Sequence, residues 1–378
     1  MATDGLPDEI VVNILARLPP KPLIRFRCVS KYWQSMLMDP YFMKLRSRKI
    51  IVLFLGKTLQ FIDINVPTDD RTYSIFECSS PLEQLGLKQT CAQVIGSFNG
   101  LVVMVNVNAF VLYNRFTGEF KKLPSPPAPN HWNCGYGFGY GATPNDLKIV
   151  RFKLSSDICD VYDFRRNSWS SFNTEIYDIR LFQYPVGTFV NGYLYWVNTN
   201  TSTYNKELIV LSVKDMVLSK RILPCTCNIE CLGTINGCLC LLKKITNSSR
   251  FELWVMKEHD IESSWMNTHS FMLDSIESFN SRILKIMDDG RILMLNRSEQ
   301  LIIYDISKST YKTLKISLGD NYSYSSFQCV EYVETLVSPL EIGRQKEEIK
   351  EDKEKNLQMR CFRFTCLLAV SIIIWSFR

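Results

Sequence analysis

The chain has 378 residues, of which 46% are hydrophobic and 22% are charged, and its formal net charge is +6. This balance predicts a globular protein with a substantial core and argues against disordered, collagen-like and disulfide-scaffold classes. The N-terminus shows no leading apolar run, which argues against a secretory signal peptide. Thirteen cysteines without framework spacing predict reduced thiols and a cytoplasmic or nuclear protein.

The first 42 residues carry the signals of three short helices. Pro7 sits at a probable first helical position and is followed by two acidic residues, which favour a helix N-terminus. Apolar residues then recur at helical spacing over 10–18, and prolines end this run. Further helical runs cover 23–28 and 31–37. So small a segment rarely folds alone, so we expect a partner protein or, alternatively, the rest of the chain to cover it.

This segment resembles an F-box in the order and spacing of its motifs, Leu6-Pro7-x-Glu9, Ile14-Leu15-x-x-Leu18-Pro19, Arg25 to Lys31, and Trp33. The resemblance implies a domain over 1–47 that docks onto the Skp adaptor of a cullin-based ubiquitin ligase. Large apolar side chains at the centre of an interface usually carry most of its binding energy. Carried over by position, the adaptor-binding residues are Leu6, Pro7, Ile10, Ile14, Leu15, Leu18, Pro19, Leu23, Cys28, Val29 and Trp33.

The positive charge is concentrated in the same segment. Residues 1–49 contain nine Lys or Arg against four Asp or Glu, which gives +5 of the total of +6. A basic docking segment favours an acidic partner and speeds its encounter. A nucleic-acid footprint is the alternative, but the basic residues are interleaved with the apolar ones and no nucleic-acid motif accompanies them.

From residue 50 onward the pattern changes to short β-type runs separated by turn residues. Asn99-Gly100, Asn191-Gly192, Asn236-Gly237 and Asp289-Gly290 are favoured hairpin turns, and a strand follows each at once. With one divergent copy near 145–146, the turns recur with a period of roughly 46 residues, typical of propeller blades. The length allows about six blades. A pair of β-sandwiches also explains the strands, but it does not explain the period.

Both ends of the β region are expected to build the first blade, with strands at 50–55 and 59–64 closed by 327–337. Residues 96–340 also resemble the plant F-box-associated interaction domain, a kelch-like module. The motifs that carry the resemblance include Gly137 to Tyr140, Asp146 to Phe152, Val190 to Val197 and Tyr332 to Pro339. The resemblance implies a plant source and a substrate-recruiting role. The fold class is therefore mainly β, a kelch-like β-propeller over 48–340 with a small helical F-box in front.

Candidate chemical sites are few. The three histidines, His131, His259 and His269, fall in no triad or metal motif. Five cysteines, Cys225, Cys227, Cys231, Cys238 and Cys240, lie within 16 residues, and four thiolates can hold zinc. The last two, however, alternate along a predicted strand, where small buried residues pack, and no Cys-x-x-Cys pair is present. The sequence therefore predicts no catalytic residue, no metal and no cofactor.

The C-terminus departs from the pattern of the rest. Residues 341–360 form a highly charged linker, and 361–378 form a hydrophobic tail. Its 14 uncharged residues, Phe364 to Phe377, fall short of the ~20 that span a bilayer. A membrane anchor or surface helix and a tail folded back on the propeller both stay open.

Together these features predict a non-catalytic substrate receptor of a Skp–cullin–F-box (SCF) ubiquitin ligase. The sequence does not identify the protein target. Loops at 126–132, 198–206 and 247–250 are candidates for binding it, because recognition usually lies in loops on a rigid scaffold. The alternative is a propeller enzyme or small-molecule sensor whose helical cap is incidental.

Overall fold

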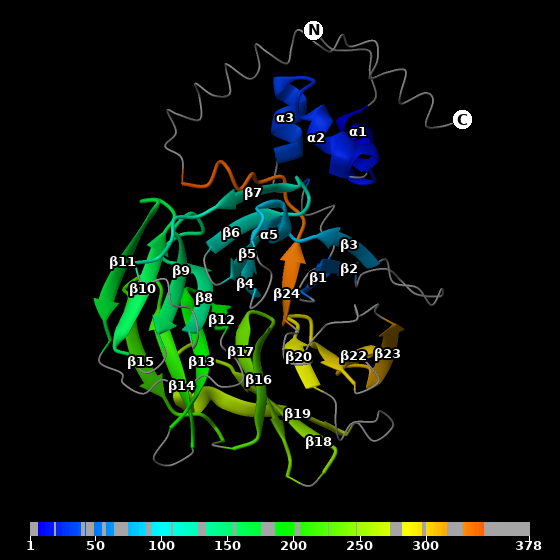
Figure 1. Ribbon diagram of the computed structural model, residues 1–378. Helices are drawn as coiled ribbons and strands as arrows, with labels where there is room; N and C mark the ends of the chain where they lie inside the picture. The colour runs from blue at the N-terminus through cyan, green and yellow to red at the C-terminus, as the bar shows by residue number, and fades with distance from the viewer. Residues whose placement is uncertain are drawn as a thin grey trace.

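A computed structural model describes the chain over residues 7–18, 20–38, 42, 49–54, 58–63, 75–87, 92–106, 109–127, 134–153, 156–174, 186–200, 205–225, 227–246, 248–272, 282–296, 300–315 and 328–343. Within these residues it consists of a small helical module and a ring of six four-stranded sheets. Figure 1 shows the helices apart from the ring and the strands arranged around a centre.

The helical module contains α1 (Asp8–Ala16), α2 (Pro20–Phe26) and α3 (Lys31–Met38). Two acidic residues open α1, where they favour the helix dipole, and the Ser30 hydroxyl accepts a hydrogen bond from the Trp33 amide at 3.1 Å at the start of α3. The helix α2 begins earlier than the sequence predicted. Its prolines stand in the first turn, where a missing N–H costs nothing, so they start this helix as well as ending α1.

Each blade of the ring is an antiparallel meander. Blade 1 contains β24 (Gln328–Val333), β1 (Lys49–Phe54), β2 (Thr58–Asp63) and β3 (Ile75–Ser79). Blade 2 contains β4 (Gln93–Phe98), β5 (Leu101–Asn106), β6 (Ala109–Asn114) and β7 (Glu119–Lys122). Blade 3 contains β8 (Cys134–Tyr140), β9 (Leu147–Lys153), β10 (Ile158–Asp163) and β11 (Ser168–Asn173). Blade 4 contains β12 (Thr188–Val190), β13 (Tyr193–Thr199), β14 (Lys206–Ser212) and β15 (Val217–Arg221). Blade 5 contains β16 (Ile229–Ile235), β17 (Cys238–Lys244), β18 (Arg250–Met256) and β19 (Trp265–Met272). Blade 6 contains β20 (Arg282–Ile286), β21 (Arg291–Leu295), β22 (Gln300–Asp305) and β23 (Thr310–Lys315).

The ring closes through blade 1, as the sequence predicted. Strand β24 pairs antiparallel with β1, with Val330 opposite Val52 and Tyr332 opposite Ile50. One edge strand of each blade contacts the corresponding strands of the two neighbouring blades. These inner strands, which line the centre of the ring, are β24, β4, β8, β12, β16 and β20. The six-bladed propeller is therefore held shut by hydrogen bonds between the two ends of the β region.

The core lies between the blades rather than in one central mass. Trp196 on β13 illustrates this, because its indole N–H donates to the Tyr136 carbonyl of blade 3 at 3.0 Å and its ring meets Phe152 edge-on. Glycines allow this approach. A Cβ at Gly187 would lie 2.5 Å from the indole ring, and one at Gly137 would lie 2.8 Å from it. The glycine-rich run in β8 thus serves blade packing.

The repeated turns join the first and second strands of their blades. At Asn99-Gly100, Asn191-Gly192 and Asn236-Gly237 both residues have positive φ, as the mirror-image hairpin turn requires. At Asp289-Gly290 only the glycine does. There the Gly290 amide donates to the Met287 carbonyl, so this hairpin has a longer turn than the sequence predicted.

The C-terminal linker and tail, beyond residue 343, fall outside the described residues. Among the helices that are described, none has both the length and the apolar character needed to cross a membrane. The other short helical elements are α5 (Pro81–Gln84), which Ser80 caps, and η1 (Glu262–Ser264).

Candidate adaptor-docking surface

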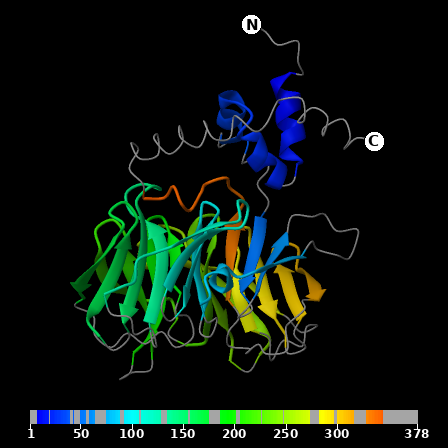
Figure 2. The same cartoon turned by 45° about the horizontal axis from the view of Figure 1, so that its top comes forward.

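The helical module rests on one end of the ring and shares its core with it. Leu15, Leu23, Leu37 and Phe42 are buried in a cluster that also contains Phe116 and Leu336 from the ring. Figure 2 shows the module above the ring, with the segment that follows β24 lying across the end that faces it. The sequence left open the alternative that the helical segment packs on the rest of the chain. The module does pack on the ring, because ring side chains complete its interior.

Several large apolar side chains of the module stay in solvent. Ile10, Ile14 and Val29 are exposed to 45%, 37% and 43%, and Tyr32 to 54%. Pro7 and Cys28 are also exposed. Helices of soluble proteins usually bury such side chains, and grouped exposed ones mark an interaction surface. Of the predicted adaptor-binding residues, Pro7, Ile10, Ile14, Cys28 and Val29 are therefore available to a partner.

The other predicted residues have different positions. Leu15 and Leu23 lie inside the module, with exposures of 2% and 0%, so the adaptor contact that the F-box resemblance implied for them stays a prediction. Their faces of α1 and α2 turn toward the shared core, so they support the surface from behind. Leu18 and Trp33 are half-buried against the same core, and Trp33 packs on Phe26. Leu6 and Pro19 fall outside the described residues.

The cysteines of the 225–240 segment are divided between two cores. Cys231 and Cys240 lie in the cluster between blades 5 and 6, whereas Cys225 packs in the cluster between blades 4 and 5. Burial raises the pKa of the Cys225 thiol to about 11, which disfavours the thiolate that a metal requires. In the part of the chain that the structure describes, no group of three His, Cys, Asp or Glu is placed to hold a metal ion.

Histidine positions follow the same structural pattern. The imidazole of His259 lies 3.2 Å from the Tyr195 hydroxyl and packs against Tyr193, so it joins the β18–β19 turn to blade 4. A bidentate pair between Arg221 and Asp260 reinforces this contact. The His269 Nδ1 lies 3.2 Å from the hydroxyl of its neighbour Thr268, and His131 falls outside the described residues. The contacts of His259 hold two blades together.

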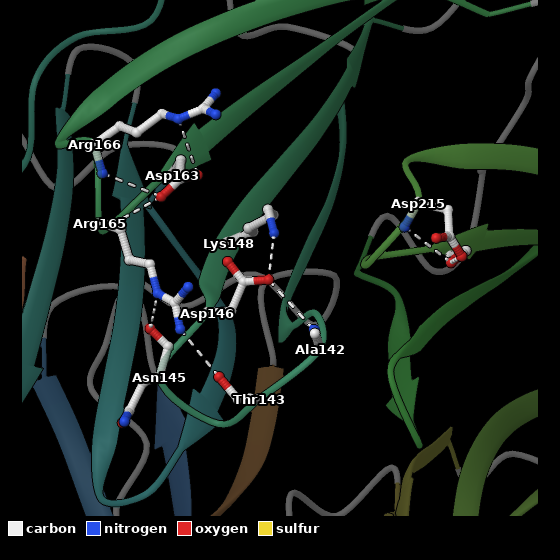
Figure 3. Close-up of polar contacts among 10 residues, drawn as sticks. Ala142, Thr143, Asn145, Asp146, Lys148, Asp163, Arg165, Arg166 and Asp215 are labelled. Carbon is white, nitrogen blue, oxygen red and sulfur yellow. Dashed lines mark hydrogen bonds and ion pairs between the residues drawn. The ribbon is translucent and has the colours of Figure 1, made fainter.

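Two turns of blade 3 hold charged and polar side chains that hydrogen-bond to one another (Figure 3). The Asp146 carboxylate accepts from Lys148 at 2.8 Å and from the Ala142 amide at 3.3 Å. Burial alone would raise the pKa of Asp146, but these donors outweigh it and hold the pKa below its usual range. Arg165 donates to the Thr143 hydroxyl and the Asn145 carbonyl. The cluster joins two turns of the blade.

The two ends of the ring differ in their connections. The end beneath the module carries the turn at Gly100, which meets Thr335, and the Asn114–Phe116 turn. In an antiparallel meander the connections β13–β14 and β17–β18 then lie at the opposite end, as does the segment between β7 and β8. These are the places of the candidate substrate loops at 198–206, 247–250 and 126–132, which are described in part. The strand ends that carry the candidate loops therefore lie away from the module.

Comparison with known proteins assigns both parts. Residues 4–45 match the F-box domain, and residues 50–339 match the F-box associated beta propeller domain. The Arabidopsis thaliana F-box protein CPR1 is 24% identical, with 96% of this chain and 97% of that protein covered. An F-box/kelch-repeat protein of Arabidopsis thaliana is 26% identical, over 81% of this chain and 89% of that protein. A putative F-box protein of the same plant is 31% identical, over 52% of this chain and 55% of that protein. The chain therefore belongs to the plant F-box proteins in which an F-box precedes an F-box-associated β-propeller.

Proposed function

We propose that this protein is a substrate-recognition subunit of an SCF-type E3 ubiquitin ligase. The observation that carries the proposal is that the module exposes Ile10, Ile14 and Val29 although its core is already filled. Removal of these side chains from water by a partner is favourable. In the F-box family that partner is the Skp adaptor, and the net positive charge of 1–49 favours an acidic one.

In this proposal each segment has its own role. Residues 1–47 dock the adaptor, 48–340 bind the target protein, and 341–360 link the ring to the hydrophobic tail at 361–378. The target binds at the end of the ring away from the module, where the longer connections lie. The protein contributes no reacting group. It raises the effective concentration of target lysines near the charged conjugating enzyme, so its contribution to rate is positioning.

Ile10→Asp tests the docking surface without disturbing the fold. Ile10 is exposed and stands in the first turn of α1, where an added carboxylate favours the helix dipole. We expect capture of the full chain by a purified Skp adaptor to fall at least about tenfold, the cost of losing one central hydrophobic contact. The matched control is Ile222→Asp, which places the same charge at an isoleucine of the ring that is 71% exposed.

The proposal fails if Ile10→Asp binds the adaptor as tightly as the unchanged chain, or if Ile222→Asp weakens binding equally. Chains that lack residues 1–47 offer a second measurement, because they should retain a bound target without passing it on for modification. A chain that converts or binds a small molecule and ignores the adaptor would instead support a propeller enzyme or sensor.

A further inference from the structure

A fully buried asparagine organises the contact between the ring and the helical module. The Asn114 side chain has no exposed surface. Its amide nitrogen donates to the carbonyl oxygens of Thr335 at 3.0 Å and Val337 at 2.7 Å. Its amide oxygen accepts from the Phe116 amide at 2.8 Å and from the Tyr332 hydroxyl at 2.9 Å. All four hydrogen-bonding positions of this side chain are thus filled, which fixes its orientation.

These four bonds connect two parts of the chain that are distant in sequence, residues 114–116 and residues 332–337. Tyr332 belongs to β24, the strand that closes the ring, and is 1% exposed. Phe116 lies in the turn after β6 of blade 2. Thr335 and Val337 belong to residues 334–343, here called the strap, which leaves β24 and crosses the end of the ring. One side chain therefore ties ring closure, a turn of blade 2 and the strap together.

The strap is fixed to blades 2 and 3 farther along. Lys121 of β7 donates to the Ile342 carbonyl at 2.8 Å. Gly343 has a φ of +80°, and a Cβ there would lie 2.3 Å from the Phe164 carbonyl oxygen, so only glycine fits this approach. The strap is thus held at both ends against the ring. Leu336, its third residue, lies between the two residues whose carbonyl oxygens Asn114 binds.

Leu336 and Phe116 are the ring residues that enter the core of the helical module. Both are buried in the cluster with Leu15, Leu23 and Leu37. In addition, Arg27 of the module donates from its guanidinium to the Leu336 carbonyl at 3.1 Å. In this cluster, Asn114 therefore binds the backbone amide of Phe116 itself and the carbonyl oxygens on both sides of Leu336.

We propose that Asn114 and Tyr332 are positioning residues that hold the helical module in one orientation on the ring through the strap. The module then cannot turn relative to the ring, because its interior is completed by side chains whose backbone is fixed. Any adaptor that docks on the module takes a set position relative to the far end of the ring. This last consequence depends on the proposed function, whereas the fixed orientation does not.

Amide hydrogen exchange on the full-length chain tests the proposal with Asn114→Ala. The matched control is Asn296→Ala, which removes another buried asparagine, one that exchanges hydrogen bonds with Gln300 in blade 6. We expect the amides of α1, α2 and α3 to exchange at least about tenfold faster in Asn114→Ala, since a lost buried hydrogen-bond network loosens what it holds. In Asn296→Ala only blade 6 should exchange faster.

A second variant covers the case in which Asn114→Ala also opens the ring. Leu336→Ala leaves the Asn114 bonds to the strap backbone and removes only the side chain that enters the module. It should speed exchange in α1, α2 and α3 and leave β24 unchanged. Equal exchange of the module in Leu336→Ala and the unchanged chain would overturn the proposal, as would equal effects of Asn114→Ala and Asn296→Ala on the module.

Energy transfer from a dye on the Skp adaptor to a dye at position 308, an exposed lysine of the ring, measures orientation directly. The distance distribution should broaden in Asn114→Ala and stay narrow in Asn296→Ala, and an unchanged width in both would contradict the proposal. Adaptor affinity itself should change less than threefold in Asn114→Ala. Ile10→Asp should show the reverse pattern, with adaptor capture lost and module exchange unchanged, so failure of the proposed function is distinguishable from failure of this inference.

Discussion

The ring and the helical module solve the problem of burial in opposite ways. Each interblade cluster is built from residues of the ring and its connections alone, and Trp196 is buried between two blades with its N–H satisfied. The core of the module contains four buried side chains of its own and two more that the ring contributes. Its tryptophan, Trp33, stays half-exposed. A short helical segment can therefore present a large apolar face only because a larger body supplies part of its interior.

Trp196→Ala should have the largest effect on the self-sufficient side of this comparison. The change empties a cavity between blades 3 and 4 and leaves the Tyr136 carbonyl without its indole donor. We expect a loss of about 3–5 kcal/mol in the free energy of unfolding. Urea denaturation measures it, and a loss below about 1 kcal/mol would mean that the interblade core is not what stabilises the ring.

Leu23→Ala should affect the dependent side selectively. Leu23 has no exposed surface and contacts the module core and its two ring residues. Removing a buried leucine costs about 3 kcal/mol, which would raise exchange of the α1–α3 amides by roughly a hundredfold. The blades should keep their exchange rates. If blades 4 to 6 loosen equally, the module and ring unfold as one unit and the comparison fails.

Trp33→Ala separates stability from docking. Like Trp196→Ala, it removes an indole side chain, but this one is half-buried and packs on Phe26. The loss in the free energy of unfolding should therefore be about 1 kcal/mol or less. Capture by a Skp adaptor should nevertheless fall strongly, because tryptophan is a common anchor of interfaces. Calorimetry and adaptor capture on the same sample give both values. Retained capture would remove Trp33 from the docking surface.

His259 gives the smallest expected effect, confined to the contact between blades 4 and 5. Burial lowers the pKa of His259 below its ordinary value, although Asp260 opposes the shift. The unfolded chain therefore binds the proton more readily, and stability falls as the pH drops through the window between the ordinary pKa of about 6.5 and the lower folded value. His259→Gln should flatten this dependence between about pH 7 and pH 5. Thermal unfolding across that range measures it, and an unchanged slope would show that another group is responsible.

Much of the ring could be predicted because its determinants are local. Asparagine and glycine at adjacent positions specify the mirror-image turn wherever they follow a β-type run, and the spacing of these turns gave the blade period. The Asp289-Gly290 turn was predicted at the right place but too short, because aspartate there keeps negative φ and the turn is set by the Met287 carbonyl. Closure by β24 was also predictable, since the turn pattern left blade 1 without its inner strand.

The docking surface was predictable only in part. Helical spacing identifies an apolar stripe, but it does not say which half of the stripe meets the ring. Leu15 and Ile14 are neighbours in sequence, yet the first is buried and the second exposed, because Phe116 and Leu336 approach one side of α1 and α2. Those two residues stand 220 positions apart, and nothing local joins them. Asn114 was missed for the same reason, as its four partners meet only in the folded ring.

Closure by the last strand has a consequence for synthesis on the ribosome. The edge of β1 has no inner neighbour until residue 333 has left the exit tunnel, although the module and five blades are by then already made. During that interval β1 presents unpaired backbone groups, a template for pairing with other chains. Leu336 follows three residues after β24, so completion of the ring and completion of the module interior occur almost together. A nascent chain therefore acquires a finished F-box only once its propeller is shut.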